Sequence, residues 1–209
     1  MTFLALLDYA SVLVFALSGA LVASRAQLDI VGFAFVACLT ALGGGTLRDL
    51  LLDRNPVFWI DNPNYILLAA LAAVAVFFSA HLLESRLRWV VWLDSFALAV
   101  AVPAGTGAAL ALDSPPVITV LMGMAPGTMG GLMRDVVCNE VPLVLKQGEL
   151  YISCDMAGAI SAVMMIWLGL EVRFALLACA GVCWTLIRRD PAASWCWSCR
   201  AIRPIWPAP

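Results

Sequence analysis

The sequence predicts an all-α membrane protein with seven transmembrane helices, arranged as two inverted three-helix repeats followed by a seventh helix. Two observations lead to this fold class. First, 63% of the 209 residues are hydrophobic and only 12% are charged, whereas a soluble domain has about 45–50% apolar and about 25% charged residues. Second, the chain repeats its pattern of charged, glycine and proline residues after a shift of 86 positions.

Seven apolar runs approach the roughly 20 residues that a helix needs to cross a bilayer. They cover residues 3–24, 29–52, 63–83, 88–110, 115–138, 149–169 and 172–188. Helices are expected because the strands of a membrane β-barrel alternate apolar and polar residues, and these runs do not. The first run contains Asp8 and lacks a basic leading segment, so we expect it to stay in the mature protein rather than act as a signal peptide.

The two halves of the chain align without a gap at the shift of 86 residues. The identical pairs include Leu7-Asp8 and Leu93-Asp94, Gly19 and Gly105, Gly44-Gly45 and Gly130-Gly131, Arg48-Asp49 and Arg134-Asp135, Pro56 and Pro142, and Tyr65-Ile66 and Tyr151-Ile152. We therefore divide the chain into two three-helix repeats at 1–86 and 87–171, a seventh helix at 172–189 and a cytoplasmic or interfacial tail at 190–209. Because three is odd, the second repeat enters the membrane inverted, an arrangement typical of transport proteins.

Basic residues gather on one side of this predicted topology. The loops after the first, third and fifth spans and the C-terminal tail carry Arg25, Arg86, Arg88, Lys146, Arg188, Arg189, Arg200 and Arg203. Apart from the two repeated arginines, the opposite side carries Arg54 and Arg173. The positive-inside rule then predicts a multi-pass protein of the inner (plasma) membrane, with a cytoplasmic C-terminus and an external N-terminus.

Glycine and proline fall in the middle of the second and fifth spans. The second span contains Gly43-Gly44-Gly45 followed by Thr46, and the fifth contains Pro126-Gly127 and then Gly130-Gly131. Glycine adds backbone freedom and proline removes a helix hydrogen bond, so we expect each span to be interrupted by a hinge. Carbonyls freed at such a break persist at membrane depth only where protein or water covers them, which favours a pathway.

Ionisable residues lie close to these predicted hinges and at the ends of the first and fourth spans. They are Arg48, Asp49, Arg134, Asp135, Asp8 and Asp94. Charges in membrane spans are costly and mark either a pathway or a buried pair. The alternative is purely structural, with each Arg-Asp as a salt bridge and each Gly-Gly as a site of close helix packing. Because both motifs recur in both repeats, we favour a pathway with these charges at its mouth or gate.

The stretch GGGTLRDLLLDRNPVFW and its counterpart GGLMRDVVCNEVPLVL resemble the paired signatures of the prokaryotic trimeric intracellular cation (TRIC) channel family. The resemblance covers about residues 1–188. It implies a homotrimer with an ion pathway in each protomer, permeable to monovalent cations, chiefly potassium, and bordered by the second and fifth helices. It carries over onto Gly43, Gly44, Gly45, Arg48, Asp49, Gly130, Gly131, Arg134 and Asp135. Relatives in the same sequence family have been proposed to be glycine transporters, which is the alternative that the resemblance implies.

A channel and a carrier would use the same residues in different ways. A channel needs a wet path lined by oxygens that bind ions weakly, and the hydroxyls of Ser18, Thr46, Thr106 and Thr128 are candidates. Membrane Ser and Thr hydroxyls more often bond to their own helix. A glycine carrier would bind the substrate carboxylate through Arg and its ammonium through Asp. A third reading is a structural membrane scaffold, and the sequence alone does not separate the three.

We expect no enzyme activity, no cofactor and no fixed metal, the permeant potassium ion aside. His81 is the only histidine, and no catalytic set accompanies it. Cys196 and Cys199 have the spacing of half a zinc site, but a second pair is missing. The net charge of −2 gives no reason to expect nucleic acid. The expected partners are other protomers and membrane lipid.

Overall fold

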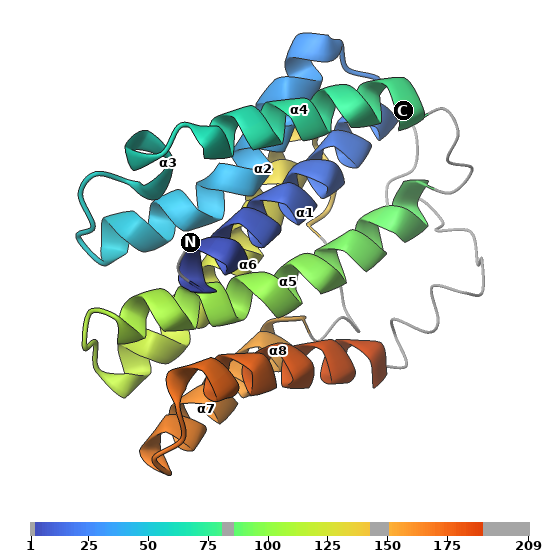
Figure 1. Ribbon diagram of the computed structural model, residues 1–209. Helices are drawn as coiled ribbons and strands as arrows, with labels where there is room; N and C mark the ends of the chain where they lie inside the picture. The colour runs from blue at the N-terminus through green and yellow to red at the C-terminus, as the bar shows by residue number, and fades with distance from the viewer. Residues whose placement is uncertain (1–2, 81–85, 143–150, 190–209) are drawn as a thin grey trace.

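The computed structural model describes residues 3–80, 86–142 and 151–189, and these residues form a bundle of α-helices (Figure 1). The helices in chain order are α1 (Phe3–Arg25), α2 (Ile30–Leu51), α3 (Phe58–Asp61), α4 (Asn64–Ser79), α5 (Arg86–Leu110), α6 (Pro116–Val137), α7 (Tyr151–Trp167) and α8 (Val172–Arg189). Helix is the only regular secondary structure in the described ranges, which confirms the predicted all-α class.

Seven of these helices are apolar, and each coincides with one of the predicted apolar runs. Four are long and apolar enough to cross a membrane: α1, α2, α6 and the part of α5 from Trp89 to Leu110. The apolar stretches Asn64–Ser79, Ile152–Trp167 and Val172–Ile187 are shorter within the described residues. The protein is therefore a multi-pass helical membrane protein.

Helices α1 and α5, which open the two predicted repeats, pack against each other along the middle of the bundle (Figure 1). Helices α2 and α4 cover α1, whereas α6, α7 and α8 pack around α5, and α2 also contacts α6. Small residues make these contacts close: Ala16, Ala20 and Ala23 on α1 are completely buried. Alanine at such positions lets helix backbones approach each other.

The predicted interruptions of the second and fifth spans are wrong. Helix α2 continues from Ile30 to Leu51 through all three glycines, and α6 continues from Pro116 to Val137 with Pro126 inside it. Each helix keeps its hydrogen bonds on both sides of the glycine or proline. Neighbouring helices pack tightly against these positions and cover the backbone there. The glycines in α2 and α6 therefore have another use.

The glycines allow α2 and α6 to cross with their backbones in contact. A Cβ atom placed on Gly44 would lie 2.0 Å from the carbonyl oxygen of Pro126. A Cβ atom on Gly130 would lie 2.6 Å from the carbonyl oxygen of Thr40. Gly130 and Pro126 are the residues that match Gly44 and Thr40 at the shift of 86, so the crossing uses the same pair of positions twice.

The same correspondence holds inside each half. A Cβ atom on Gly19 would lie 3.0 Å from the Val36 carbonyl oxygen, and one on Gly105 would lie 2.0 Å from that of Met122. Met122 precedes Pro126 by four residues, so its carbonyl has no helical N–H partner at position 126. The close approach of α5 at Gly105 covers this carbonyl, so it does not open a break in α6.

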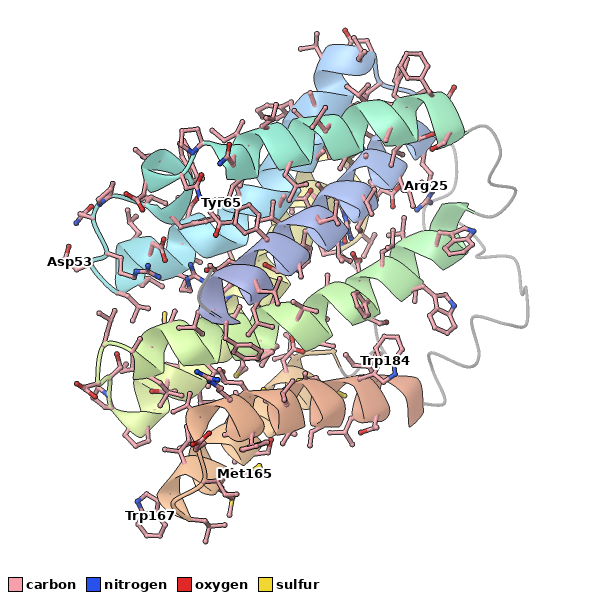
Figure 2. All side chains as sticks on the ribbon, in the orientation of Figure 1. Arg25, Asp53, Tyr65, Met165, Trp167 and Trp184 are labelled. Carbon is pink, nitrogen blue, oxygen red and sulfur yellow. The ribbon has the colours of Figure 1, made fainter. Side chains whose placement is uncertain are left out.

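Aromatic contacts fix the outer helices. Tyr65 on α4 stacks on Tyr9 of α1 with ring centroids 4.1 Å apart, and its edge meets Phe58 at 4.9 Å. In the other half, Trp184 on α8 meets the ring of Phe96 on α5 at 5.8 Å (Figure 2). Aromatic pairs at these separations add to the packing of apolar surface. They hold α3 and α4 to α1, and α8 to α5.

Candidate functional site

The first charge cluster joins α1, α2 and the start of α3. Arg48 donates from Nη1 to Asp8 Oδ1 at 2.7 Å and from Nε to Asp49 Oδ1 at 2.9 Å. The second oxygen of Asp49 accepts the backbone N–H of Phe58 at 2.9 Å, and Arg54 lies 3.6 Å from Oδ1. Two arginines thus balance two carboxylates. Buried charges persist when they are paired and hydrogen-bonded in this way.

The second charge cluster joins α5, α6 and α1. Arg134 is completely buried and donates from Nη1 and Nη2 to the two oxygens of Asp94 at 2.7 and 2.9 Å. Its Nε donates to Asp135 at 2.7 Å. The Ser18 hydroxyl accepts from Arg134 and donates to Asp94. This two-pronged geometry is the strong form of an arginine–carboxylate pair, and Ser18 ties it to the opposite half.

The two clusters differ at one position. Every guanidinium nitrogen of Arg134 has a hydrogen-bond partner, whereas Arg48 Nη2 is buried without one in the described part of the chain. The residue that matches Ser18 at the shift of 86 is Ala104. The hydroxyl that completes the second cluster is therefore missing from the first.

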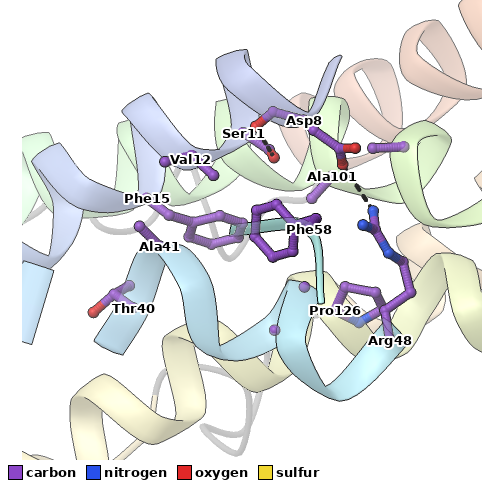
Figure 3. Close-up of a pocket in the computed structure, with 13 residues that line it drawn as sticks. Asp8, Ser11, Val12, Phe15, Thr40, Ala41, Arg48, Phe58, Ala101 and Pro126 are labelled. Carbon is purple, nitrogen blue, oxygen red and sulfur yellow. Dashed lines mark hydrogen bonds and ion pairs between the residues drawn. The ribbon is translucent and has the colours of Figure 1, made fainter. Parts of the chain in front are cut away.

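A cavity lies where this hydroxyl is missing (Figure 3). Its lining includes Ala104, Asp8 and Arg48 at the charged end, together with the Gly44–Pro126 crossing of α2 and α6. The cavity volume is about 20 Å³, which is room for about one water molecule. The side chain of Asp8 is 17% exposed and that of Arg48 is 2% exposed, so Asp8 is the more accessible of the two charges beside the cavity.

The candidate hydroxyls fall into two groups. Those of Thr46, Thr106 and Thr128 donate to the backbone carbonyl four residues earlier in their own helix, at 2.7, 2.9 and 3.1 Å. This is the common use of threonine in membrane helices, so these three hydroxyls donate to the backbone. Ser18 is the exception, since its hydroxyl completes the second charge cluster.

The structure gathers some of the predicted pathway residues around the cavity and leaves others apart. Gly44, Gly45 and Pro126 line it, together with Asp8 and Arg48. The rest lie outside the lining: Gly43, Thr46, Asp49, Gly127, Gly130, Gly131, Arg134, Asp135 and Asp94. The six predicted charges therefore form two separate clusters, of which only the first borders the cavity.

Sequence reasoning missed two residues of interest. Phe58 lines the cavity and donates its backbone N–H to Asp49. Asp155 is completely buried in α7. The signal in the sequence that could have identified it is its carboxylate inside the sixth apolar run. His81, Lys146, Cys196 and Cys199 lie outside the described residues.

An all-helical bundle with four membrane-length apolar helices and two buried arginine–carboxylate clusters defines a polytopic membrane protein. The sequence model of the family described as "Glycine transporter" matches residues 5–81 and again residues 91–167. The fold is similar to that of the TRIC trimeric intracellular cation channel orthologue from Rhodobacter sphaeroides, with a TM-score of 0.88, 38% identity and coverage of 93% of this chain and 99% of that one. The chain belongs to the TRIC/UPF0126 family of membrane proteins.

Curated relatives agree with this assignment. A UPF0126 membrane protein of Vibrio cholerae is 36% identical over 194 residues, which cover 91% of this chain and 79% of the relative. The UPF0126 inner membrane protein YadS of Escherichia coli is 32% identical over 190 residues, which cover 90% and 91% of the two chains. The two matches of the family model begin 86 residues apart, at the same shift as the paired motifs.

Proposed function

We propose that the protein is a homotrimeric channel for monovalent cations, permeable to potassium, with an ion path in each protomer beside the crossing of α2 and α6. The observation that carries the proposal is the cavity between Arg48, Asp8 and the Gly44–Pro126 contact. The TRIC channel of Rhodobacter sphaeroides, at 38% identity over nearly the whole chain, supports the same function.

The proposed topology has seven spans in two inverted repeats, with a cytoplasmic C-terminus and the inner membrane as its location. The matched pairs Gly44–Pro126 and Gly130–Thr40 support the repeats, because a two-fold relation between α2 and α6 produces both contacts at once. The name of the Escherichia coli relative supports the location.

The charges around the cavity suit a cation path. In the first cluster Asp8 and Asp49 balance Arg48 and Arg54, so the arginines add no net positive barrier. A bare potassium ion is about as large as a water molecule, and the cavity has room for about one water. Asp8 provides a carboxylate oxygen at the charged end, where an ion must bind weakly enough to leave.

Single-channel recording tests this path. The protein is reconstituted in a planar bilayer with a potassium gradient, where discrete openings are expected. Ala104→Ser should lower the conductance, because it gives the first cluster the hydroxyl that Ser18 gives the second and fills part of the cavity. Ala108→Ser, one turn further along α5 and equally buried, is the control and should conduct normally.

Two results would overturn the proposal. A bilayer that stays silent while saturable uptake occurs in liposomes would exclude a channel. Equal conductance in wild type, Ala104→Ser and Ala108→Ser would show that ions do not pass the cavity.

A glycine carrier is the second candidate function, and a specific observation favours it. The unpartnered Nη2 of Arg48 can donate a hydrogen bond to a carboxylate, and the Asp8 carboxylate nearby can accept one from an ammonium group. The family model is described as "Glycine transporter". The cavity has room for about one water molecule, so a carrier has to widen it to bind glycine. Saturable uptake of labelled glycine into liposomes is the measurement that favours this candidate.

A further inference from the structure

A lone carboxyl group is buried in α7, away from both charge clusters. Asp155 has no exposed surface, and neither of its carboxyl oxygens has a hydrogen-bond partner in the described part of the chain. Its Oδ2 faces α6, where a Cβ atom on Gly127 would lie 4.0 Å away. The adjacent residue Cys154 accepts a weak hydrogen bond from the Cys183 thiol of α8 at 3.7 Å. Asp155 therefore lies where α6, α7 and α8 meet.

Among the residues with described side chains, none on the surrounding helices pairs an opposite charge with Asp155. Of the side chains that the structure describes, the titratable groups on the helices that pack against α7 are Asp94 on α5, Arg134 and Asp135 on α6, and the thiols of Cys179 and Cys183 with the exposed Arg173 on α8. The first three bond to one another, and no ion pair to Asp155 occurs among the residues with described side chains. The contact of α7 with α8 is made by small apolar and thiol side chains.

The chemistry of this environment selects the ligand. An ionised carboxylate without a partner is far more costly to bury than a neutral carboxylic acid. A metal cation needs several oxygen ligands, and among the described residues no group of three or more His, Cys, Asp or Glu is placed to hold one. A proton needs only the carboxyl group itself.

We propose that Asp155 is a proton-binding site that locks α7 and α8 against α6. The carboxyl group keeps its proton at neutral pH while the three helices are packed together. Ionisation places an unpaired negative charge in the contact, and the charge is relieved only when the helices separate and water enters. The matching residue of the first half is Ala69, so the lock belongs to the second half alone.

Infrared spectroscopy of the full-length protein in lipid tests the protonation state directly. At neutral pH the wild type should show the carbonyl band of a protonated carboxylic acid. Asp155→Asn and Asp155→Ala should both lack that band. Asp155→Ala places at this position the residue that the first half has at the matching position, Ala69. Asp8→Asn is the control, because Asp8 is paired with Arg48, and this variant should keep the band.

A spectrum in which wild type and Asp155→Asn are identical would overturn the proposal, because Asp155 would then be ionised. A carboxylate band at Asp155 that shifts when potassium is added would also overturn it and would indicate a cation site. Neither result bears on whether the protein conducts ions, so this test is separate from the bilayer recordings.

The pH dependence of thermal stability provides a second test. The folded protein holds a proton that an exposed carboxyl group in the unfolded chain has released. Above the pH at which an exposed carboxyl ionises, wild-type stability should therefore fall, by up to about tenfold in the folding equilibrium for each pH unit. In the same range Asp155→Asn should lose this dependence. Equal pH profiles of the two proteins would contradict the lock.

Discussion

Replacing Gly44 by alanine tests the crossing of α2 and α6 most directly. The new Cβ atom would lie 2.0 Å from the Pro126 carbonyl oxygen and 2.8 Å from its carbonyl carbon, where ordinary contact begins at 3.4 Å. The oxygen contact is thus 1.4 Å too short, because 2.0 Å is measured against 3.4 Å. Both atoms belong to a helix backbone, so relief requires the two helices to move apart.

The expected cost follows from comparison with the neighbouring glycine. Gly43→Ala makes the same change in helix propensity, but its Cβ atom meets only the Met133 sulfur at 2.8 Å, at the far end of a flexible side chain. Overpacking a tight contact costs about 1–3 kcal/mol. We therefore expect Gly44→Ala to be less stable than Gly43→Ala by about 1–3 kcal/mol.

Heating the purified variants in one detergent, followed by size-exclusion of the surviving protein, gives an apparent melting temperature for each. The rate of heating is kept the same, because unfolding of such proteins is often irreversible. Gly130→Ala, with 2.6 Å to the Thr40 carbonyl oxygen, should fall between Gly43→Ala and Gly44→Ala. If Gly44→Ala and Gly43→Ala have the same apparent melting temperature, the two helices do not cross as closely as the structure shows.

Two further predictions concern the second charge cluster, with Thr106→Val as their control, and the same melting assay checks all three variants. Arg134→Met should destabilise the protein by about 3–5 kcal/mol, because the buried carboxylates of Asp94 and Asp135 both lose the guanidinium that bonds them; a variant as stable as the wild type would contradict the pairing. Ser18→Ala should cost about 1–3 kcal/mol through two lost hydrogen bonds. Thr106→Val should change little, since that hydroxyl bonds only its own helix.

The helices and the pairing of the two charged motifs could be predicted because both depend on patterns along the chain. Apolar runs of membrane length lie where α1, α2, α5 and α6 form. The shift of 86 residues that pairs Arg48 with Arg134 also pairs their contacts, since Asp8 bonds the first arginine and Asp94 the second. Local pattern was enough for these features. The number of spans and their orientation stay predictions.

The use of the glycines could not be predicted, because it depends on a distant backbone. Gly44 faces the carbonyl oxygen of Pro126, 82 positions further along the chain, since 126 minus 44 is 82. From the sequence, a glycine that bends a helix and a glycine that admits a second helix are the same residue. The choice between them is made by packing, which closes α2 and α6 onto each other and keeps both helices continuous.

The pairing of the charges was predicted only in part for a similar reason. An Arg-Asp dipeptide suggests that the two neighbours neutralise each other, and Arg48 does bond Asp49. Its second carboxylate comes from Asp8 on another helix. Asp155 was missed because it has no counterpart in the first half, and a search for repeated residues passes over a residue that occurs once.

The differences between the two halves are more informative about function than their likeness. The two halves carry matching Arg-Asp motifs, but Ser18 completes the bonds of Arg134, whereas Ala104 leaves Arg48 with an unpartnered N–H, among the described residues, and an adjacent cavity. A saturated buried network is rigid, so the second cluster serves to hold α5, α6 and α1 together. The first cluster has the unpartnered N–H of Arg48 and the cavity beside it, next to the partly exposed Asp8. The cavity borders the first cluster, so the ion path that we propose passes through the first half of the chain, and the saturated second cluster supports it.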